Sequence, residues 1–296
     1  MPVDLHIHTT ASDGSATPTE VVETAAKLGL STISITDHES IEGCLEASLV
    51  GRRRGVQVIP GVELLTTHRG REVHLLGYFV DMNSSLLEGR LKKLREQRNT
   101  VAQETVERLK RYGINVKWDQ VQNVVPENGV IGKNHILHAI REAGYIQTRI
   151  QAVEILRRYL SQDGLAYVEF SQHSFTDAVE LIRKARGVPV VAHPALIRDD
   201  NLLQELLGLG DIGLEVYYYY LGDQREEWVR RYECMAIDNG LLATGGTDFH
   251  GSYAPVRLGQ MNVPEKVVHD LIKFYENISK KYFSQEGNFD AITNKI

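Results

Sequence analysis

The strongest constraint in this sequence is the placement of histidines and carboxylates at the ends of short apolar segments. The first segment, Val3 to His8, alternates apolar with polar residues, which is the period of a β-strand. Six more strand candidates follow, and most alternate with helical patterns, which favours a parallel α/β architecture. Because the polar residues gather at the C-terminal strand ends, where barrel enzymes build active sites, we expect a barrel rather than an open sheet.

A helical pattern interrupts this alternation in the middle of the chain. Apolar residues recur at helical spacing from Leu86 to Leu109, and helical segments continue to about Leu160. We predict a first barrel part at residues 1–83, a mostly helical insertion over the barrel mouth at 84–165, and a second barrel part with a C-terminal helix at 166–296. The insertion holds 14 Lys and Arg against 9 Asp and Glu, so it is basic although the whole chain carries −6.

Composition narrows the class of protein. Hydrophobic residues make up 42% of the chain, as in globular proteins, and the net negative charge argues against a dedicated binder of duplex DNA. Cys44 and Cys234 form no CxxC motif, and no apolar run reaches the roughly 20 residues of a membrane span. Since the N-terminus has no signal-peptide pattern, we expect a cytoplasmic protein without a membrane partner, and its oligomeric state is left open.

His6 and His8 lie two residues apart in the first strand, so both face the same side, about 7 Å apart. Such a pair can hold a metal ion, and the alternative of two exposed strand histidines has comparable weight. Residues of metal-binding type that lie in or after the strand candidates shift the balance toward a metal: Asp13, His38, Glu63, His74, His193, Asp248 and His250. Imidazole and carboxylate without thiolate suit zinc, manganese or iron.

This ligand set predicts hydrolysis of a phosphate ester. A carboxylate such as Glu63 can bridge two metals, and two close metals activate a shared water and hold the attacking and leaving oxygens of a phosphoryl group. The sequence contains neither a GxxxxGK phosphate loop nor a GxSxG nucleophile elbow. We therefore expect metal-assisted chemistry rather than a serine nucleophile or a phosphate-binding loop.

Five segments, in this order, resemble the motifs of the PHP (polymerase and histidinol phosphatase) superfamily: Asp4–Ser15, Thr36–His38, Pro60–Glu63 with His74, Ala192–Pro194 and Gly246–His250. The resemblance covers about residues 1–83 and 166–262, and it implies a distorted (β/α)7 barrel. Many relatives have histidine in place of Asp13. An aspartate there, with a helical insertion, is similar to the subgroup that hydrolyses nucleoside 3′,5′-bisphosphates and includes 5′→3′ exoribonuclease activity on short RNA.

The resemblance implies a metal centre with two or three divalent ions, manganese first and zinc or iron as alternatives. Carried over position by position, the ligands form three sets: His6, His8, Glu63 and Asp248; Glu63, His74 and His193; and Asp13, His38 and His250. We expect a hydroxide that bridges the first two metals to attack phosphorus. The candidate catalytic residues are Asp37, which can orient its neighbour, and the metal-bound His193 and His250.

The candidate substrate contacts are Lys133, His135 and Arg198. The first two lie where the subgroup often has Arg-Gly-His, and Arg198 lies near the arginine of its Ala-His-Pro-Gly-Arg motif. Both departures concern substrate choice and leave metal binding untouched. Glu215 fits either support of a ligand or a rim carboxylate. The tyrosines at 217–220 can stack a nucleobase, although such residues more often pack under helices.

Several alternatives stay open. One alternative is a histidinol-phosphate-type or other phosphatase of the same superfamily, although Asp13 and the insertion speak against it. A metal-dependent amidohydrolase would be favoured by a barrel lysine or another ligand order, and a non-catalytic metal-binding module by missing ligands; neither is observed. We predict a phosphoesterase for a small phosphorylated substrate, namely the 3′-phosphate of nucleoside 3′,5′-bisphosphates, or for the 5′ end of short RNA.

Overall fold

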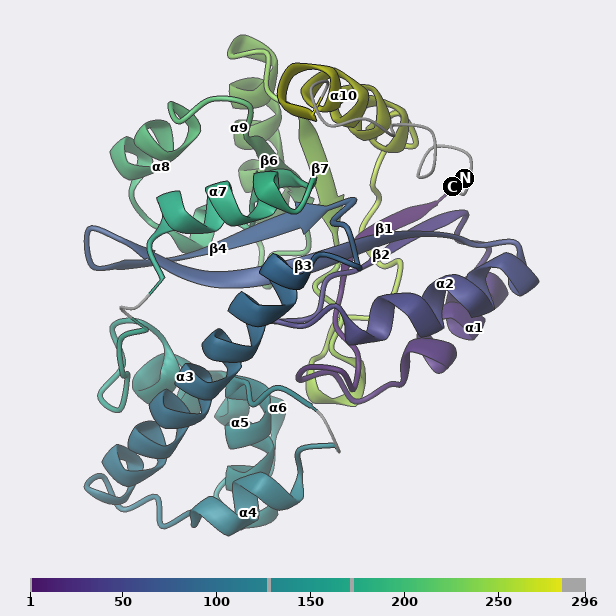
Figure 1. The fold of residues 1–296 in the computed structure, drawn as a ribbon. Coiled ribbons are helices and arrows are strands. Elements are labelled where there is room, and N and C mark those ends of the chain that lie inside the picture. Colours follow the sequence, from purple (N-terminus) through teal and green to yellow (C-terminus); the bar gives the residue numbers. More distant parts are fainter. Residues whose placement is uncertain (1, 127–128, 171–172, 284–296) are drawn as a thin grey trace.

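A computed structural model describes residues 2–126, 129–170 and 173–283 of the protein. Seven strands form one sheet in chain order: β1 (Val3–Ile7), β2 (Thr32–Ile35), β3 (Gln57–His68), β4 (Arg71–Tyr78), β5 (Val188–Val191), β6 (Gly213–Tyr218) and β7 (Ala243–Gly246). The sheet nearly closes, because the His8 amide donates to the Phe249 carbonyl at 2.8 Å and Ile7 bridges Phe249 in parallel. The expected distorted seven-stranded barrel is confirmed (Figure 1).

The expectation of a parallel sheet is wrong for one strand. β4 runs antiparallel to both β3 and β5, whereas the other neighbouring strands are parallel. β3 continues to His68, and only Arg69 and Gly70 separate it from β4. Two residues can close a hairpin but cannot carry a parallel crossover. Both have left-handed backbone, with φ of 50° and 73°, as the tight turns of two-residue hairpins require.

Helices cover the outside of the barrel: α1 (Pro18–Leu28), α2 (Glu42–Arg54), α7 (Phe175–Lys184), α8 (Asp200–Leu207), α9 (Arg225–Asp238) and α10 (Lys266–Phe283), with short 3₁₀ turns η2 (Pro194–Leu196) and η3 (Gly251–Tyr253). The start of α1 agrees with the sequence. Thr17 and Glu20 form a reciprocal capping box, and Pro18 occupies the first turn. This cap ends the loop that carries Asp13, so it fixes one side of the barrel mouth.

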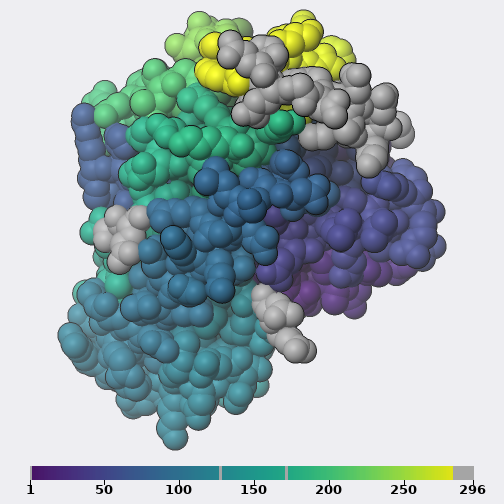
Figure 2. Space-filling view, viewed as in Figure 1, coloured from purple at the N-terminus to yellow at the C-terminus, as the bar shows by residue number. Residues whose placement is uncertain are grey.

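The helical segment, as we call Ser85–Leu160, lies between β4 and β5. It consists of α3 (Ser85–Lys110), α4 (Trp118–Asn123), α5 (Lys133–Glu142), α6 (Arg149–Ile155) and a π-helical turn, η1 (Leu156–Leu160). It has its own hydrophobic cluster, in which Val106 and Leu109 of α3 pack with Ile136 and Ile140 of α5. In the space-filling view its blue-to-teal surface forms a lobe beside the barrel (Figure 2).

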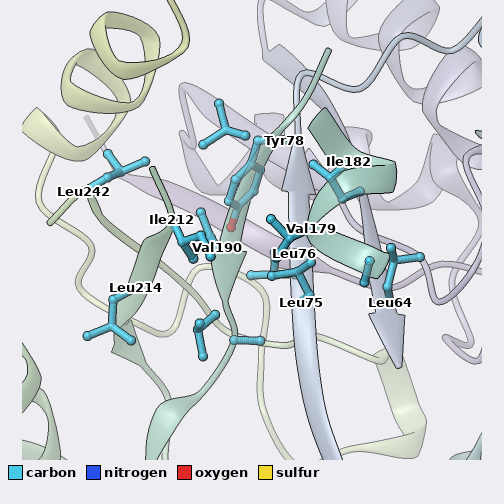
Figure 3. Close-up of a cluster of buried hydrophobic side chains, with 14 of the residues drawn as sticks. Leu64, Leu75, Leu76, Tyr78, Val179, Ile182, Val190, Ile212, Leu214 and Leu242 are labelled. Atoms are coloured by element: carbon cyan, nitrogen blue, oxygen red, sulfur yellow. The ribbon is translucent and has the colours of Figure 1, made fainter. Parts of the chain in front are cut away.

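The largest hydrophobic cluster joins the strands to the helices around them. In Figure 3, Leu64, Leu76 and Val190 of the barrel lie near Val179 and Ile182 of α7. Helix α7 approaches the sheet closely at Gly77, where an added Cβ would lie 2.4 Å from Ile182. This rigid packing holds the strand ends in place. In the part of the chain that the structure describes, no helix is both long and apolar enough to cross a membrane.

Candidate metal centre

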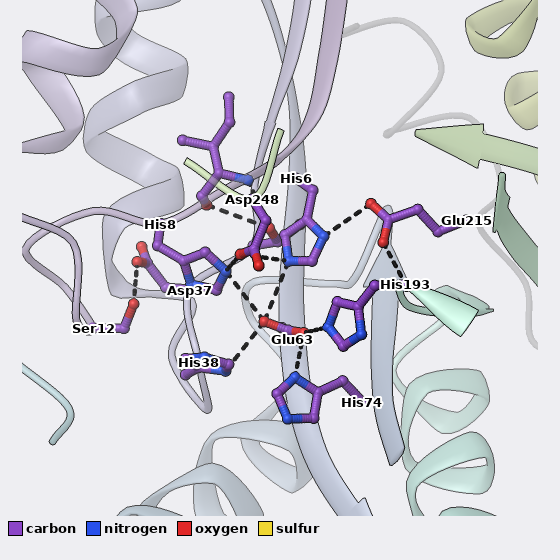
Figure 4. Close-up of polar contacts among 12 residues, drawn as sticks. His6, His8, Ser12, Asp37, His38, Glu63, His74, His193, Glu215 and Asp248 are labelled. Carbon is purple, nitrogen blue, oxygen red and sulfur yellow. Dashed lines mark hydrogen bonds and ion pairs between the residues drawn. The ribbon is translucent and has the colours of Figure 1, made fainter. Parts of the chain in front are cut away.

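Glu63 of β3 lies at the centre of the polar cluster in the barrel mouth (Figure 4). Its Oε2 atom is 3.3 Å from His6 Nε2, 3.1 Å from His8 Nε2 and 3.2 Å from His38 Nδ1. The His6 and His8 side chains are fully buried, and that of Glu63 is 1% exposed. One carboxylate oxygen therefore faces three imidazoles, which come from β1, from the residue directly after β1 and from the loop after β2.

The other oxygen of Glu63 faces the remaining pair of histidines. Oε1 is 2.7 Å from His74 Nδ1 and 3.2 Å from His193 Nε2. β4 carries His74, and β5 ends just before His193. Because its two oxygens point to different sets of histidines, Glu63 has the geometry of a carboxylate that bridges two metal ions.

Two acidic residues from other loops complete the cluster. Asp248 Oδ1 is 3.0 Å from His8 Nε2 and 3.3 Å from His6 Nε2, and Asp13 Oδ1 is 3.2 Å from His250 Nε2. Three groups have ligand atoms within 4.8 Å of one another: His6, His8, Glu63 and Asp248; His8, Asp13, His38 and His250; and His38, Glu63 and His74. All nine residues expected as ligands from the sequence thus lie in one cluster.

The first of these groups is identical to the first expected set of ligands. The other two groups differ from the second and third expected sets. His8 joins the expected third set, and His38 stands near Glu63 and His74. His193 reaches the cluster through Glu63. The assignment of individual ligands to individual ions therefore stays a prediction.

The cluster is suited to metal ions because several of its polar atoms are buried and form no hydrogen bonds with one another. Among the described residues, His6 Nε2, Asp13 Oδ1, His38 Nδ1, Glu63 Oε2 and Asp248 Oδ1 are buried and lack a hydrogen-bond partner. Buried polar atoms normally have partners, so a group of unpartnered donors and acceptors needs a cause. Imidazole nitrogens and carboxylate oxygens that converge on common points are suited to bind divalent metals.

The charges of the cluster lead to the same conclusion. Burial lowers the pKa of His8, but hydrogen bonds and charges from Asp248 and Glu63 outweigh it and raise the pKa to about 10. Burial likewise acts to lower the pKa of His74, yet Glu63 and Glu72 raise it to about 9. Burial acts to raise the pKa of Glu63, but the surrounding histidines hold it well below its usual range. The carboxylates attract positive charge, which protons or metal ions can supply.

Buried carboxylates outside the cluster hold its ligands. Glu215, fully buried on β6, accepts from the His193 amide at 2.7 Å, and its other oxygen is 2.9 Å from His6 Nδ1. Of the two roles open for Glu215, the geometry agrees with support of a ligand and not with a rim position. Asp37 is also fully buried and accepts from Thr9 and Ser12, so it orders the loop that leads to Asp13.

The candidate substrate contacts differ in their positions. Lys133 Nζ lies 2.6 Å from Glu72, which in turn is 3.4 Å from His74 Nε2, so Lys133 stands at the edge of the cluster. His135 is fully buried, and its Nε2 lacks a hydrogen-bond partner among the described residues. The Arg198 side chain is 65% exposed and lies 3.6 Å from Asp163. No described contact joins Arg198 to the metal-binding cluster.

Three contacts in the mouth were not predicted from the sequence. Glu72 lies two residues before His74 on the same strand. The alternation of side chains along a strand therefore indicates that Glu72 and His74 face the same side. The buried ion pair of Arg98 and Glu39 joins α3 to the loop after His38, and the signal was an arginine in the apolar stripe of α3. Gly132 lies against Asp13, where an added Cβ would be 1.9 Å from Oδ2, and no sequence pattern indicated this contact.

Several known proteins are similar to this chain in sequence. The chain is 30% identical over 84% of its length to a 3′,5′-nucleoside bisphosphate phosphatase of Chromobacterium violaceum, covering 87% of that protein. It is 29% identical over 88% to a phosphoribosyl 1,2-cyclic phosphate 1,2-diphosphodiesterase of Eggerthella lenta, covering 98%, and 31% identical over 87% to the 5′-3′ exoribonuclease Rnm of Escherichia coli, covering 88%.

Comparison with solved structures agrees. A metal-dependent phosphoesterase structure from Bifidobacterium adolescentis superposes with a TM-score of 0.81 at 29% identity, covering 93% of this chain and 98% of that one. The PHP domain family matches residues 4–283. The chain therefore belongs to the PHP domain family and is a metal-dependent phosphoesterase with a His, Asp and Glu cluster suited to binding metals.

Proposed function

We propose that the protein hydrolyses a phosphate monoester, preferably the 3′-phosphate of nucleoside 3′,5′-bisphosphates, and also acts on the 5′ end of short phosphorylated RNA. The observation that carries this proposal is the position of the start of α5 beside the cluster. Gly132 lies against Asp13, and Asn134 Nδ2 donates to Asp13 Oδ2 at 3.3 Å. Lys133 and His135 flank this contact, so a second phosphate of the substrate would meet them beside the metals.

The proposed ligands are those of the cluster, in two or three sites, with manganese as the preferred ion and zinc or iron as alternatives. When bound, divalent ions lower the pKa of a bound water and neutralise phosphoryl oxygens. Glu63 would connect two of the sites through its two oxygens. Asp37, His193 and His250 would act by orienting the loop and the ligands around the phosphorus atom, which is their proposed part in catalysis.

The helical segment would select the substrate. Burial lowers the pKa of His135, so its imidazole stays neutral, and its Nε2 can form a hydrogen bond with a phosphate or sugar oxygen. Lys133 would exchange Glu72 for a phosphate oxygen, because a dianionic phosphate is a stronger partner than a carboxylate. Arg198, exposed and bound to Asp163, would contact only a longer substrate such as an RNA strand.

The test, carried out in manganese, measures phosphate release from adenosine 3′,5′-bisphosphate and from histidinol phosphate. It also measures nucleotide release from a 5′-phosphorylated oligoribonucleotide and ring opening of a phosphoribosyl 1,2-cyclic phosphate. We expect the bisphosphate to react fastest, the RNA to react more slowly, and a chelator to abolish both reactions. If only histidinol phosphate or only the cyclic phosphate reacted fast, that compound would replace the bisphosphate as the proposed substrate.

A matched pair of variants tests the part assigned to the helical segment. Lys133→Met should raise KM for the bisphosphate about tenfold or more, because a charge-assisted contact to phosphate is lost. Lys93→Met removes an exposed lysine from α3 of the same segment and should leave KM unchanged. Equal KM values for the two variants would remove Lys133 from the substrate site.

A further inference from the structure

The run of tyrosines after Val216 places two neighbouring hydroxyl groups on opposite sides of β6. Tyr217 faces outward, and its hydroxyl lies 2.6 Å from Glu233 of α9. Tyr218 faces the barrel mouth, and its hydroxyl donates to Asp248 Oδ2 at 2.9 Å. The alternation of side chains along a strand produces this difference. Tyr218 is therefore a partner of the metal-binding cluster, and Tyr217 is not.

The two oxygens of Asp248 have different surroundings. Oδ1 lies 3.0 Å from His8 Nε2 and 3.3 Å from His6 Nε2, and it lacks a hydrogen-bond partner among the described residues. Oδ2 points the other way and is bound by Tyr218. If the carboxylate were free to rotate about its Cβ–Cγ bond, Oδ1 and Oδ2 would exchange positions. The hydroxyl of Tyr218 fixes which oxygen faces the histidines.

The backbone at Asp248 makes such a support necessary. Its φ is +54°, a left-handed conformation that residues other than glycine adopt only at some energetic cost. It lies in the loop after β7, and its side chain is 21% exposed, more than the buried histidines around it. A ligand on a strained and partly exposed loop needs an outside contact to keep its orientation.

The ring of Tyr218 is itself held in place. Its centroid lies 5.2 Å from that of His193, at an interplanar angle of 67°, and 6.3 Å from that of His6. On another side the ring of Tyr220 lies 4.7 Å away. Figure 4 shows His6, His193 and Asp248, three of the residues around Tyr218, close to Glu63. The hydroxyl group is thus presented to Asp248 by a rigid ring.

We propose that Tyr218 is a positioning residue of the metal centre, whose hydroxyl holds Asp248 so that Oδ1 faces the ion shared with His6, His8 and Glu63. The proposal rests on the metal ligands assigned under the proposed function, but not on the substrate. Partners that orient metal ligands from outside typically change metal affinity by about 10- to 100-fold when removed. Tyr218 should contribute to metal affinity by that amount.

The experiment measures metal affinity, independently of activity. Metal-free protein is titrated with Mn²⁺ in competition with a chelating indicator, for wild type, Tyr218→Phe and Tyr217→Phe. We expect Tyr218→Phe to bind one ion about 10- to 100-fold more weakly. Tyr217→Phe, which loses the same hydroxyl from the neighbouring residue, should bind like wild type. Equal affinity of Tyr218→Phe and wild type would overturn the proposal.

A second pair of variants tests whether Tyr218 acts through Asp248. In an Asp248→Ala background, removal of the Tyr218 hydroxyl should cause no further loss of affinity, and a further loss would contradict the proposal. The visible spectrum of the Co²⁺-loaded protein should change in Tyr218→Phe alone of the two tyrosine variants, because the ligand geometry changes. If wild type binds metal but releases no phosphate, the proposed substrate fails and the role of Tyr218 stands; if wild type binds no metal, both fail.

Discussion

Polar side chains in the barrel mouth and in the helical segment differ in whether they have partners of opposite charge or hydrogen-bond partners. In the barrel, buried imidazoles and carboxylates converge and leave several atoms without hydrogen-bond partners. In the helical segment, the cations that reach the mouth already have carboxylate partners, such as Glu39 for Arg98 and Glu72 for Lys133. The barrel is thus suited to receive cations, whereas the helical segment docks on the barrel through charges that are already paired.

Histidines illustrate the same difference. His8, surrounded by carboxylates, has its pKa raised to about 10 although burial acts against this. His173, fully buried beside the helical segment, has its pKa lowered to about 4 by burial and by the charge of Arg90. Burial is common to both residues, so the carboxylate neighbours account for the raised pKa of His8. At His38, burial and the charge of Arg98 outweigh Glu63 and Asp13, and the pKa is lowered. A buried histidine indicates a metal site only when acidic groups surround it.

The largest expected effect concerns Glu63, whose two carboxylate oxygens both contact histidines of the cluster. Glu63→Gln should lower phosphate release by more than about 100-fold, beyond the usual effect of an outer partner, and should reduce the metal content. Metal analysis and initial rates on the same preparation measure both. Glu205→Gln, a surface carboxylate beside His68, serves as the control and should change neither. A Glu63→Gln variant with full metal content and rate would separate Glu63 from the metal centre.

The next effect concerns the docking of the helical segment. Arg98→Met would leave Glu39 buried and unpaired, which costs about 3–5 kcal/mol of unfolding free energy. Urea denaturation measures it. Arg54→Met breaks an exposed pair with Glu23 and should cost less than about 1 kcal/mol. The double variant Arg98→Met with Glu39→Gln should recover part of the loss, and similar losses for the buried and exposed pairs would contradict this picture.

A smaller effect is expected where α5 meets the loop of Asp13. Gly132→Ala would place a methyl group 1.9 Å from Asp13 Oδ2, and overpacking of this kind costs about 1–3 kcal/mol. It should also weaken the site formed by Asp13, His38 and His250 more than the site of His6. Gly89→Ala in α3, with open space around the new methyl, should be neutral or slightly stabilising. Thermal melts and metal titration distinguish the two variants.

A further effect is the pH dependence contributed by His173. Its pKa is about 4 in the folded protein, below the ordinary 6.5, so between these values the unfolded chain binds the extra proton. His173 therefore destabilises the fold progressively as pH falls from about 6.5 to 4, by at most about 1.4 kcal/mol per pH unit. In metal-free protein, His173→Gln should reduce that slope between pH 6.5 and 4. An unchanged slope would remove His173 as its source.

The barrel ligands could be predicted from the sequence because parallel strands deliver their C-terminal ends to one place. A histidine after one strand and an acidic residue after another, such as His8 and Asp248, then become neighbours although they lie far apart in the chain. The alternation of strands and helices predicts a parallel β4, whereas the two-residue Arg69-Gly70 turn makes β4 antiparallel. Even so, His74 reaches the cluster, because side-chain alternation does not depend on strand direction.

The contacts of the helical segment could not be predicted in the same way. Its docking depends on where a separate hydrophobic core places α3 and α5, and nothing in the local pattern around Gly132 specifies a contact with Asp13. The assignment of Arg198 to the substrate rested on a motif, whereas its described partner is Asp163. The limits of the three parts expected from the sequence, at 83/84 and 165/166, stay predictions, since the hydrophobic clusters alone do not define domain boundaries.

The most direct test of the central claim is X-ray diffraction from crystals grown with manganese, measured near the manganese absorption edge. We predict two or three anomalous peaks, one of them among His6, His8, Glu63 and Asp248, and another near Asp13, His38 and His250. Peaks at these positions would identify the barrel mouth as the metal centre. Well-ordered side chains there without anomalous density, or manganese bound only elsewhere, would contradict the account.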